Sequence, residues 1–205
     1  MKKFITALFI LFALHSNGQQ TILKGAAGIE FGSTREVVAN AMRTLHKDAR
    51  FTETRENSAF YVGGKWAGRD VLIWAFTFTT TGKLHTIAII MNPAHQSEVF
   101  TLYDDVVADL SDKYGDPKEE DVYETWKYPY ASSDKYTLGV TAIKTGNCSI
   151  CTFYWFPGSD GSMGDNKNSI YVKITDNVNV MVKYQDGILS NDLVKQREVK
   201  KQKDM

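Results

Sequence analysis

Two cysteines are the residues of this chain whose spacing could support redox chemistry. Cys148 and Cys151 form a Cys-x-x-Cys pattern, which in thiol-exchange enzymes opens a helix whose dipole lowers the pKa of the first thiol. Here the pair leads into Thr152–Phe156, a β-branched and aromatic run that predicts a strand. We interpret the pair as a structural disulfide across a local turn or bulge near Gly146 and Asn147. Two free thiols are the alternative, and a thiol-exchange or metal role is a third.

A second group of candidate ligands lies between residues 158 and 168, where Asp and Asn oxygens cluster among glycines. Such oxygens can bind calcium, but their spacing does not match the twelve-residue calcium loop, so we predict a hairpin connection instead. The histidines His46, His85 and His95 lack the spacing of zinc ligands. No carboxylate pair and no Ser–His arrangement can be singled out. The sequence therefore predicts no metal, no cofactor and no catalytic residues.

Aromatic side chains offer the strongest candidate for a binding site, because rings on an uncovered sheet face can hold a protein or a sugar. Most rings, among them Trp74 and Trp155, are expected in the core. Trp66 lies among glycines, however, and several rings crowd residues 123–130. We place the predicted site on an open sheet face at Trp66, Tyr123, Trp126 and Tyr171.

The elements that must position these rings begin with a helix. Ser33 and Glu36 form a capping-box pattern, and apolar residues at helical spacing follow as far as Leu45. Beyond residue 51 the period changes to two, which is typical of strands with one buried face. We predict strands at 51–55, 59–62, 72–79 and 84–91, the last two joined by a turn at Thr81-Gly82-Lys83.

The same plan then starts again. Ser97 is a candidate N-cap for a second helix, which should end before Gly115 and Pro117. Mostly alternating segments follow it, which predict further strands. These strands are expected at 122–128, 136–143, 149–156, 169–175 and 178–184.

The predicted order is a helix followed by an antiparallel meander, and this order occurs twice along the chain. It predicts an α+β fold. We expect two tandem units at 19–94 and 95–190, each with a helix packed on an antiparallel β-meander, so that helices cover one face of the sheet. The polar run at 191–205 is expected to be a frayed or solvated tail.

Two short motifs carry a resemblance to a known group of proteins. The opening Gly32-Ser33-Thr34-Arg35-Glu36-Val37 and the helix ending Leu110-Ser111-Asp112-Lys113-Tyr114-Gly115-Asp116-Pro117 resemble those of proteins similar to the beta-lactamase inhibitor protein. The same superfamily includes small lipoproteins of the outer-membrane barrel-assembly machinery. The resemblance implies a helix packed on a four-stranded antiparallel sheet, often in two copies, and binding of other proteins through one sheet face rather than catalysis. No functional residue carries over from it.

The compartment is indicated by the start of the chain. Lys2 and Lys3 precede the largely apolar run Phe4–Leu14, and a short polar stretch with small residues allows cleavage after Gly18. We therefore predict a signal peptide at 1–18 and an exported protein, periplasmic or secreted and soluble after cleavage. No later apolar run is long enough to span a membrane.

The balance of charged residues limits the classes of partner that the chain can bind. The 24 Lys and Arg residues balance 24 Asp and Glu residues, so the chain lacks the strongly basic surface that nucleic-acid binding requires. We predict a non-enzymatic binding protein whose partner is another exported or cell-envelope protein. The alternative is a carbohydrate or small-ligand binder that uses the exposed rings, with a glycan as its partner.

Overall fold

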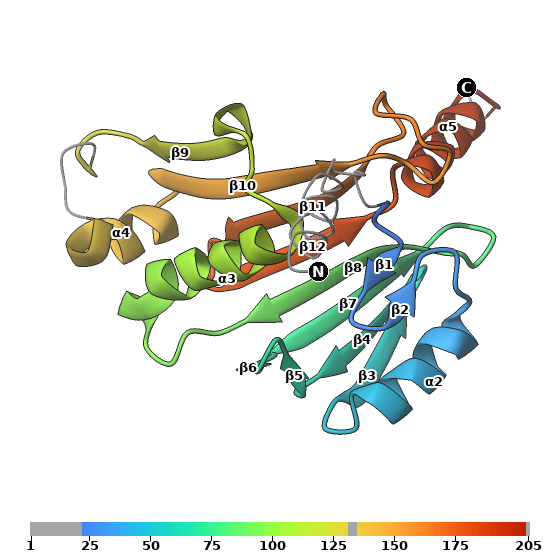
Figure 1. Cartoon of the computed structure of the whole chain (residues 1–205), viewed down its shortest axis with the longest axis horizontal. Coiled ribbons are helices and arrows are strands. Elements are labelled where there is room, and N and C mark those ends of the chain that lie inside the picture. Colours follow the sequence, from blue (N-terminus) through green and yellow to red (C-terminus); the bar gives the residue numbers. More distant parts are fainter. Residues whose placement is uncertain (1–21, 131–134, 204–205) are drawn as a thin grey trace, which may run out of the picture.

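The computed structural model describes residues 22–130 and 135–203 (Figure 1). The predicted signal peptide at 1–18 lies outside these residues. In the described part of the chain, one large antiparallel sheet of eight strands combines with helices, which confirms the predicted α+β class.

The large sheet consists of two meanders that meet through their last strands. Its order is β3-β4-β7-β8-β12-β11-β10-β9, and all neighbouring strands are antiparallel. The first meander comprises β3 (Arg50–Arg55), β4 (Ser58–Val62), β7 (Ile73–Phe78) and β8 (Leu84–Met91). The second comprises β9 (Val122–Trp126), β10 (Cys148–Phe156), β11 (Asn168–Ile174) and β12 (Val180–Gln185). Strands β3 and β9 are therefore the two edges of the sheet.

Two small hairpins and two short 3-10 turns complete the β-structure and its connections. The hairpins pair β1 (Gly25–Ala26) with β2 (Ile29–Glu30), and β5 (Lys65–Trp66) with β6 (Arg69–Asp70). The turns are η1 (Gln96–Glu98), before the second long helix, and η2 (Glu119–Asp121), before β9.

The helices α2 (Arg35–Leu45) and α3 (Val99–Tyr114) lie on the same side of the sheet (Figure 1). Thr34 caps α2, because its hydroxyl accepts the amide of Val37 at 3.4 Å, one residue beyond the expected Ser33. The buried side chains of α2, Val38 and Met42, are four residues apart on one stripe.

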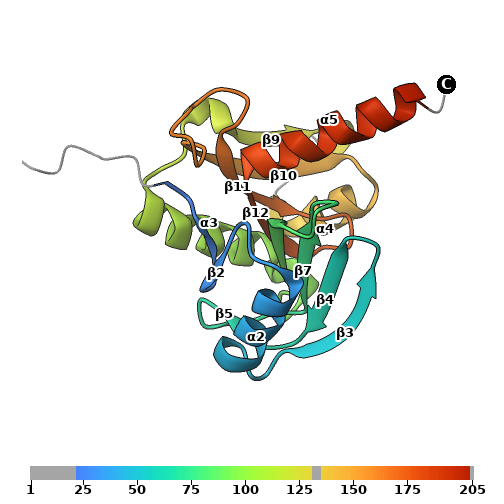
Figure 2. The ribbon, with the colours of Figure 1, turned by 90° about the vertical axis from the view of Figure 1, so that its right-hand side faces the viewer.

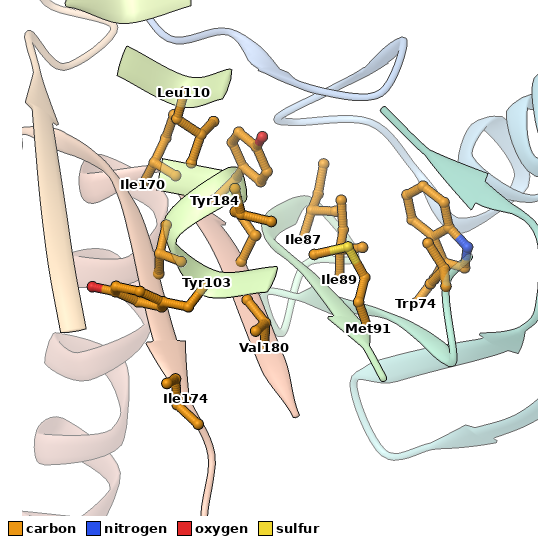
Figure 3. Packing of buried hydrophobic residues seen from close by; sticks show 14 of the residues in the cluster. Trp74, Ile87, Ile89, Met91, Tyr103, Leu110, Ile170, Ile174, Val180 and Tyr184 are labelled. Carbon is orange, nitrogen blue, oxygen red and sulfur yellow. The ribbon is translucent and has the colours of Figure 1, made fainter. Parts of the chain in front are cut away.

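The core lies between these helices and one face of the sheet. Every second residue of the central strands is buried there, as period-two alternation requires. Figure 3 shows side chains of both meanders and of α3 meeting in one cluster. Its labelled members are Trp74, Ile87, Ile89, Met91, Tyr103, Leu110, Ile170, Ile174, Val180 and Tyr184. The covered face is thus one continuous core that joins the two meanders.

Hydroxyl groups fix α3 on the second meander. The buried Tyr103 hydroxyl bonds to the Thr152 hydroxyl at 2.6 Å, and the Tyr154 hydroxyl donates to the Val107 carbonyl at 3.0 Å. Burial raises the pKa of both tyrosines. Polar groups removed from water must be paired, so these bonds specify one position of the helix on β10.

The segment 136–143, expected as a strand, is instead part of α4 (Lys135–Lys144). Its buried residues are Gly139, Ala142 and Ile143, which have helical rather than alternating spacing. A Cβ on Gly139 would lie 2.5 Å from Cε2 of Phe100, so the close packing of α4 on α3 requires glycine there. Tertiary packing therefore overrides the β-branched composition of the segment.

The polar run at 191–205, expected to be a frayed or solvated tail, is helical as far as Lys203, because α5 (Gly187–Lys203) continues through it. The helix starts at the buried Asp186, whose carboxylate accepts the amide of Leu189 at 2.8 Å. Asn168 strengthens this start by accepting the amide of Gly187 at 2.9 Å. A cap inside the core thus anchors a helix whose second half is mostly polar.

Candidate functional site

The sheet face opposite α2 and α3 is the candidate site. Figure 2 shows α3 on one side of the sheet and α5 extending on the other, beyond the end of β12. Side chains that point to this open face are partly buried rather than fully buried. The strand register places Phe153, Tyr171 and Lys183 in one row across β10, β11 and β12. Ala88 and Ala75 continue this row on β8 and β7.

Four rings form an aromatic cluster at the β9–β11 end of the open face. Phe153 is its centre: its ring centroid lies 4.5 Å from that of Tyr171 and 5.4 Å from that of Trp155, both stacked. Tyr123 of the edge strand meets Phe153 edge-on at 5.8 Å. Offset stacking and edge contacts are the favoured arrangements of aromatic rings, so the four rings hold one another in fixed positions.

Trp155 is held in place from both its edge and its face. Its indole N–H donates to the carboxylate of Asp121 at 2.7 Å, and Nζ of Lys167 lies 3.8 Å from the ring. The second contact is a cation–π interaction, which is strongest with Trp. A ligand on the aromatic cluster therefore meets a fixed indole with a positive charge beside it.

Besides Lys167, two further lysines lie beside the cluster. Lys183 has its Nζ 5.8 Å from the ring centroid of Tyr171, and Lys173 lies opposite Cys151 on the same face. Burial and the nearby positive charge of Lys173 lower the pKa of Lys183. The six strands β4, β7, β8, β10, β11 and β12 contain no Asp or Glu. The interior of the open face is therefore basic.

A groove of about 1290 Å³ runs along one end of this face, between the loop that joins β10 to β11 and helix α5. The loop is tied to the helix because Nδ2 of Asn191 donates to the Asp165 carbonyl at 2.6 Å and to Oδ1 of Asn166 at 3.2 Å. Within the loop, the carboxylate of Asp160 accepts the amide of Ser162 at 2.9 Å, which lowers its pKa. Hydrogen bonds within the loop, and between the loop and α5, therefore hold this side of the groove in place.

The predicted site residues divide between the two faces. Tyr123 and Tyr171 belong to the aromatic cluster of the open face. Trp126 lies opposite the buried Cys148 and stacks on Phe100 of α3 at 6.4 Å, on the covered side.

Trp66 lies in a separate groove of about 980 Å³ on the helix side, which Tyr114 and Tyr184 also line. Trp66 is partly buried and packs against the core. It is therefore separated from Tyr123 and Tyr171 by the sheet.

The sequence reasoning missed Phe153 and the three lysines of the open face, and it assigned Trp155 to the core. The signal was present in the alternation of β10, where Cys151, Phe153 and Trp155 share one phase and the buried Thr152 has the other. Charge identifies the exposed phase of β11 and β12, because Lys173 and Lys183 belong to it.

The expected disulfide between Cys148 and Cys151 is not formed, because both thiols are free. Strand β10 is regular from Cys148 to Phe156, without the expected bulge, so residues three apart point to opposite faces. Burial raises the pKa of Cys148 to about 11 and also raises that of Cys151. Neither thiol has the low pKa of a thiol-exchange cysteine.

Two further properties concern residues 22–130 and 135–203. Within these ranges, no group of three or more His, Cys, Asp or Glu residues is arranged to hold a metal ion. Nor does any helix there combine the length and apolar character that crossing a membrane requires.

Comparisons with protein-family models, with curated proteins and with solved structures gave no match. The resemblance to proteins similar to the beta-lactamase inhibitor protein therefore stays a prediction.

Proposed function

We propose that this chain is an exported, non-enzymatic binding protein that holds another exported or cell-envelope protein on its open sheet face. The observation that supports this proposal is the number of aromatic and aliphatic side chains on that face, on both sides of Lys173 and Lys183. Beyond Lys173, a row of aliphatic residues crosses the central strands toward the β3 edge of the sheet. This row contains Met181, Ile90, Ile73 and Val62, in register on β12, β8, β7 and β4.

Such a surface is unusual for a chain that acts alone. The aliphatic and aromatic side chains lie on both sides of Lys173 and Lys183, and large apolar patches on soluble proteins mark interaction sites. Interface centres are typically enriched in aromatic residues and Met, with charged residues at the rim. The aromatic cluster and Met181 match the first part of this description, and Arg50 with Arg55 on β3 matches the second.

The face is a better candidate than the edges of the sheet. Edge strand β3 is exposed along its whole length, carries an ion pair between Arg55 and Glu53 at 2.6 Å, and contains a register shift after Phe51. Charges and bulges on an edge discourage the addition of another strand. We therefore propose side-chain recognition on the face.

A photo-cross-linking amino acid tests this proposal in cells that export the chain. Placed at Tyr171 or Met181, it should give one discrete cross-linked product with an envelope protein. Placed at Leu45, which is exposed at the end of α2 on the helix side, it should give none. The product at Met181 should disappear when Phe153→Ser is added. Equal products at Leu45, or products that Phe153→Ser leaves unchanged, would reject the proposal.

A glycan ligand is the second candidate, and one specific observation favours it. The groove beside the aromatic cluster is lined by amide side chains, namely Gln185, Asn166 and Asn191, as well as by stacked rings. Rings and amides together suit a sugar ring and its hydroxyl groups. Titration with oligosaccharides, followed by indole fluorescence, should then saturate for the wild-type chain and not for Tyr171→Ala.

A further inference from the structure

We infer that Lys173 and Lys183 together bind one carboxylate of the partner, and that this carboxylate belongs to an acidic residue flanked by apolar residues in a peptide segment. This inference rests on the proposed function, because it specifies which protein surface the open face accepts. The lysines would form the one charged contact in the middle of an otherwise apolar and aromatic interface.

The two lysines are diagonal neighbours on adjacent strands. Lys173 of β11 lies opposite Met181 of β12, and Lys183 follows two residues later, opposite Tyr171. Residues two apart share a face, so both side chains rise from the same side of the sheet. Diagonal positions on paired strands lie roughly 7–8 Å apart, which lets two long side chains converge on one anion.

Neither lysine is neutralised by the chain itself. Among the residues that the structure describes, the ion pairs involve other cations, and the six strands β4, β7, β8, β10, β11 and β12 supply no carboxylate. Lys183 is instead partly buried against Tyr171. Burial and repulsion from the positive charge of Lys173 both destabilise the charged form of Lys183. An anion supplied by the partner would reduce the repulsion between the two lysines and would give them a counter-charge.

The surroundings of the lysines indicate a peptide rather than a glycan. On one side lies the aromatic cluster, which could serve either ligand. On the other side, Lys173 is followed across the sheet by Met181, Ile90 and Ile73, all aliphatic. Aliphatic side chains offer no hydrogen bonds to sugar hydroxyls, whereas they can bury the Leu, Ile or Phe side chains of a peptide. The carboxylate must therefore lie between apolar groups on both sides.

Binding of two matched synthetic peptides to the purified full chain tests the inference. One peptide carries a single central Glu flanked by Leu and Phe, and the other carries Gln in its place. Titration calorimetry should show that the Glu peptide binds about tenfold more tightly than the Gln peptide, the magnitude expected for one charge contact that is partly removed from water. The preference should weaken as salt is raised, because salt screens charge pairs that are not fully buried.

Three lysine variants locate the preference. Lys173→Gln and Lys183→Gln should each bind the two peptides equally, while Lys47→Gln, an exposed lysine just after α2, should keep the wild-type preference. The thermal unfolding curve of each variant confirms that it is folded. A preference that survives in both Lys173→Gln and Lys183→Gln would overturn the inference.

The remaining outcomes separate this inference from the function on which it rests. Equal binding of both peptides by the wild-type chain, lost in Phe153→Ser, would overturn the lysine inference and leave the binding face in place. If neither peptide binds but an acidic oligosaccharide binds in a Lys183-dependent way, the peptide is wrong and the glycan is right. The proposed function itself fails if the cross-links from Tyr171 and Met181 are absent, are matched at Leu45, or are left unchanged by Phe153→Ser.

Discussion

Lys183 lies beside Tyr171 on the open face, with its Nζ 5.8 Å from the centroid of the tyrosine ring. The lysine is partly buried, and the positive charge of Lys173 on the neighbouring strand acts with this burial to lower its pKa. A chain selected for stability alone would place an apolar residue here, since the rest of the row is apolar. Under the proposed function, this cost in stability serves the binding of a partner.

Replacing Lys183 with Met should stabilise the fold. Met fills a similar space and removes both the desolvated charge and its repulsion from Lys173, so we expect the free energy of unfolding to rise by about 0.5 kcal/mol or more. Urea denaturation at pH 7 measures this change. Lys47→Met, on an exposed loop, should change nothing. A loss of stability in Lys183→Met would show that the charge has a structural partner.

The gain in Lys183→Met should depend on pH. The pKa of Lys183 is lower in the folded chain than in the unfolded chain, so the unfolded chain binds more protons between the two values. Wild-type stability therefore rises with pH across that window, and the advantage of the variant should shrink between pH 7 and pH 10. An advantage that stays constant over this range would contradict the assignment of the lowered pKa.

Gly139→Ala should destabilise the chain, because a Cβ would lie 2.5 Å from Cε2 of Phe100 and the packing of α4 on α3 would have to shift. Overpacking of this kind costs about 1–3 kcal/mol. Chemical denaturation measures the loss. The matched control is Gly164→Ala, which has no atom within 4 Å of the added methyl group and should be close to neutral. Equal stabilities of the two variants would argue against tight packing of the two helices.

The bond between Tyr103 and Thr152 lends itself to a double-mutant cycle. Thr152→Val leaves the tyrosine hydroxyl buried without its partner, which costs about 1–3 kcal/mol, and Tyr103→Phe removes the hydroxyl itself. The double variant should lose less stability than the two single losses added together. Additive losses would mean that the hydroxyls do not interact. Denaturation curves of the four proteins supply the cycle.

Asp186 should make stability depend on acidity. Burial raises its pKa, so the folded chain binds more protons than the unfolded chain above the ordinary Asp value, and stability falls as pH rises through that window. Asp186→Asn keeps the cap of α5 without the charge. Thermal unfolding should therefore show the variant more stable than wild type at pH 7 but not at pH 3.

A control variant separates the cap of α5 from the charge. Asp186→Ala removes the acceptor for the amide of Leu189 and should be about 1 kcal/mol less stable than Asp186→Asn at pH 7. Equal stability of the Ala and Asn variants would show that the carboxylate does not cap the helix.

The free thiols can be verified by alkylation. Because the pKa of Cys148 is about 11, only about a thousandth of the Cys148 side chains are thiolates at pH 8. Cys148 should therefore resist iodoacetamide in the native chain. Partly exposed Cys151 should react first, and both should react in denaturant. A non-reducing peptide map that joins Cys148 to Cys151 would contradict the structure.

Much of the fold follows from period-two alternation, because one face of each central strand is buried and the other is not. Strands β7, β8 and β12 are accordingly close to their predicted ranges. The helix α4 was not predicted, because several of its residues favour strands individually and its packing against Phe100 of α3 is a contact between residues far apart in the sequence. Contacts between distant residues are not visible in local periodicity.

The candidate site was harder to predict than the fold. Ring content near residues 123–130 was visible, but the face that each ring occupies depends on the pairing of β9 with β10. Tyr123 lies opposite Cys151 and Trp126 opposite Cys148, and that register separates the two rings. A shift of one residue would exchange their faces. Pairing across a long connection is set by tertiary structure, which the sequence of one strand does not contain.

The pairing of β8 with β12 at the centre of the sheet has a consequence for the newly made chain. Strand β8 is complete long before β12 has been synthesised, and until then its backbone is an unpaired edge with apolar side chains on both faces. Such an edge recruits strands from other molecules. A truncated product that ends before β12 should therefore aggregate rather than persist as a smaller domain. Whether the N-terminal half stays in solution thus depends on whether the C-terminal third has been made and has paired β12 with β8.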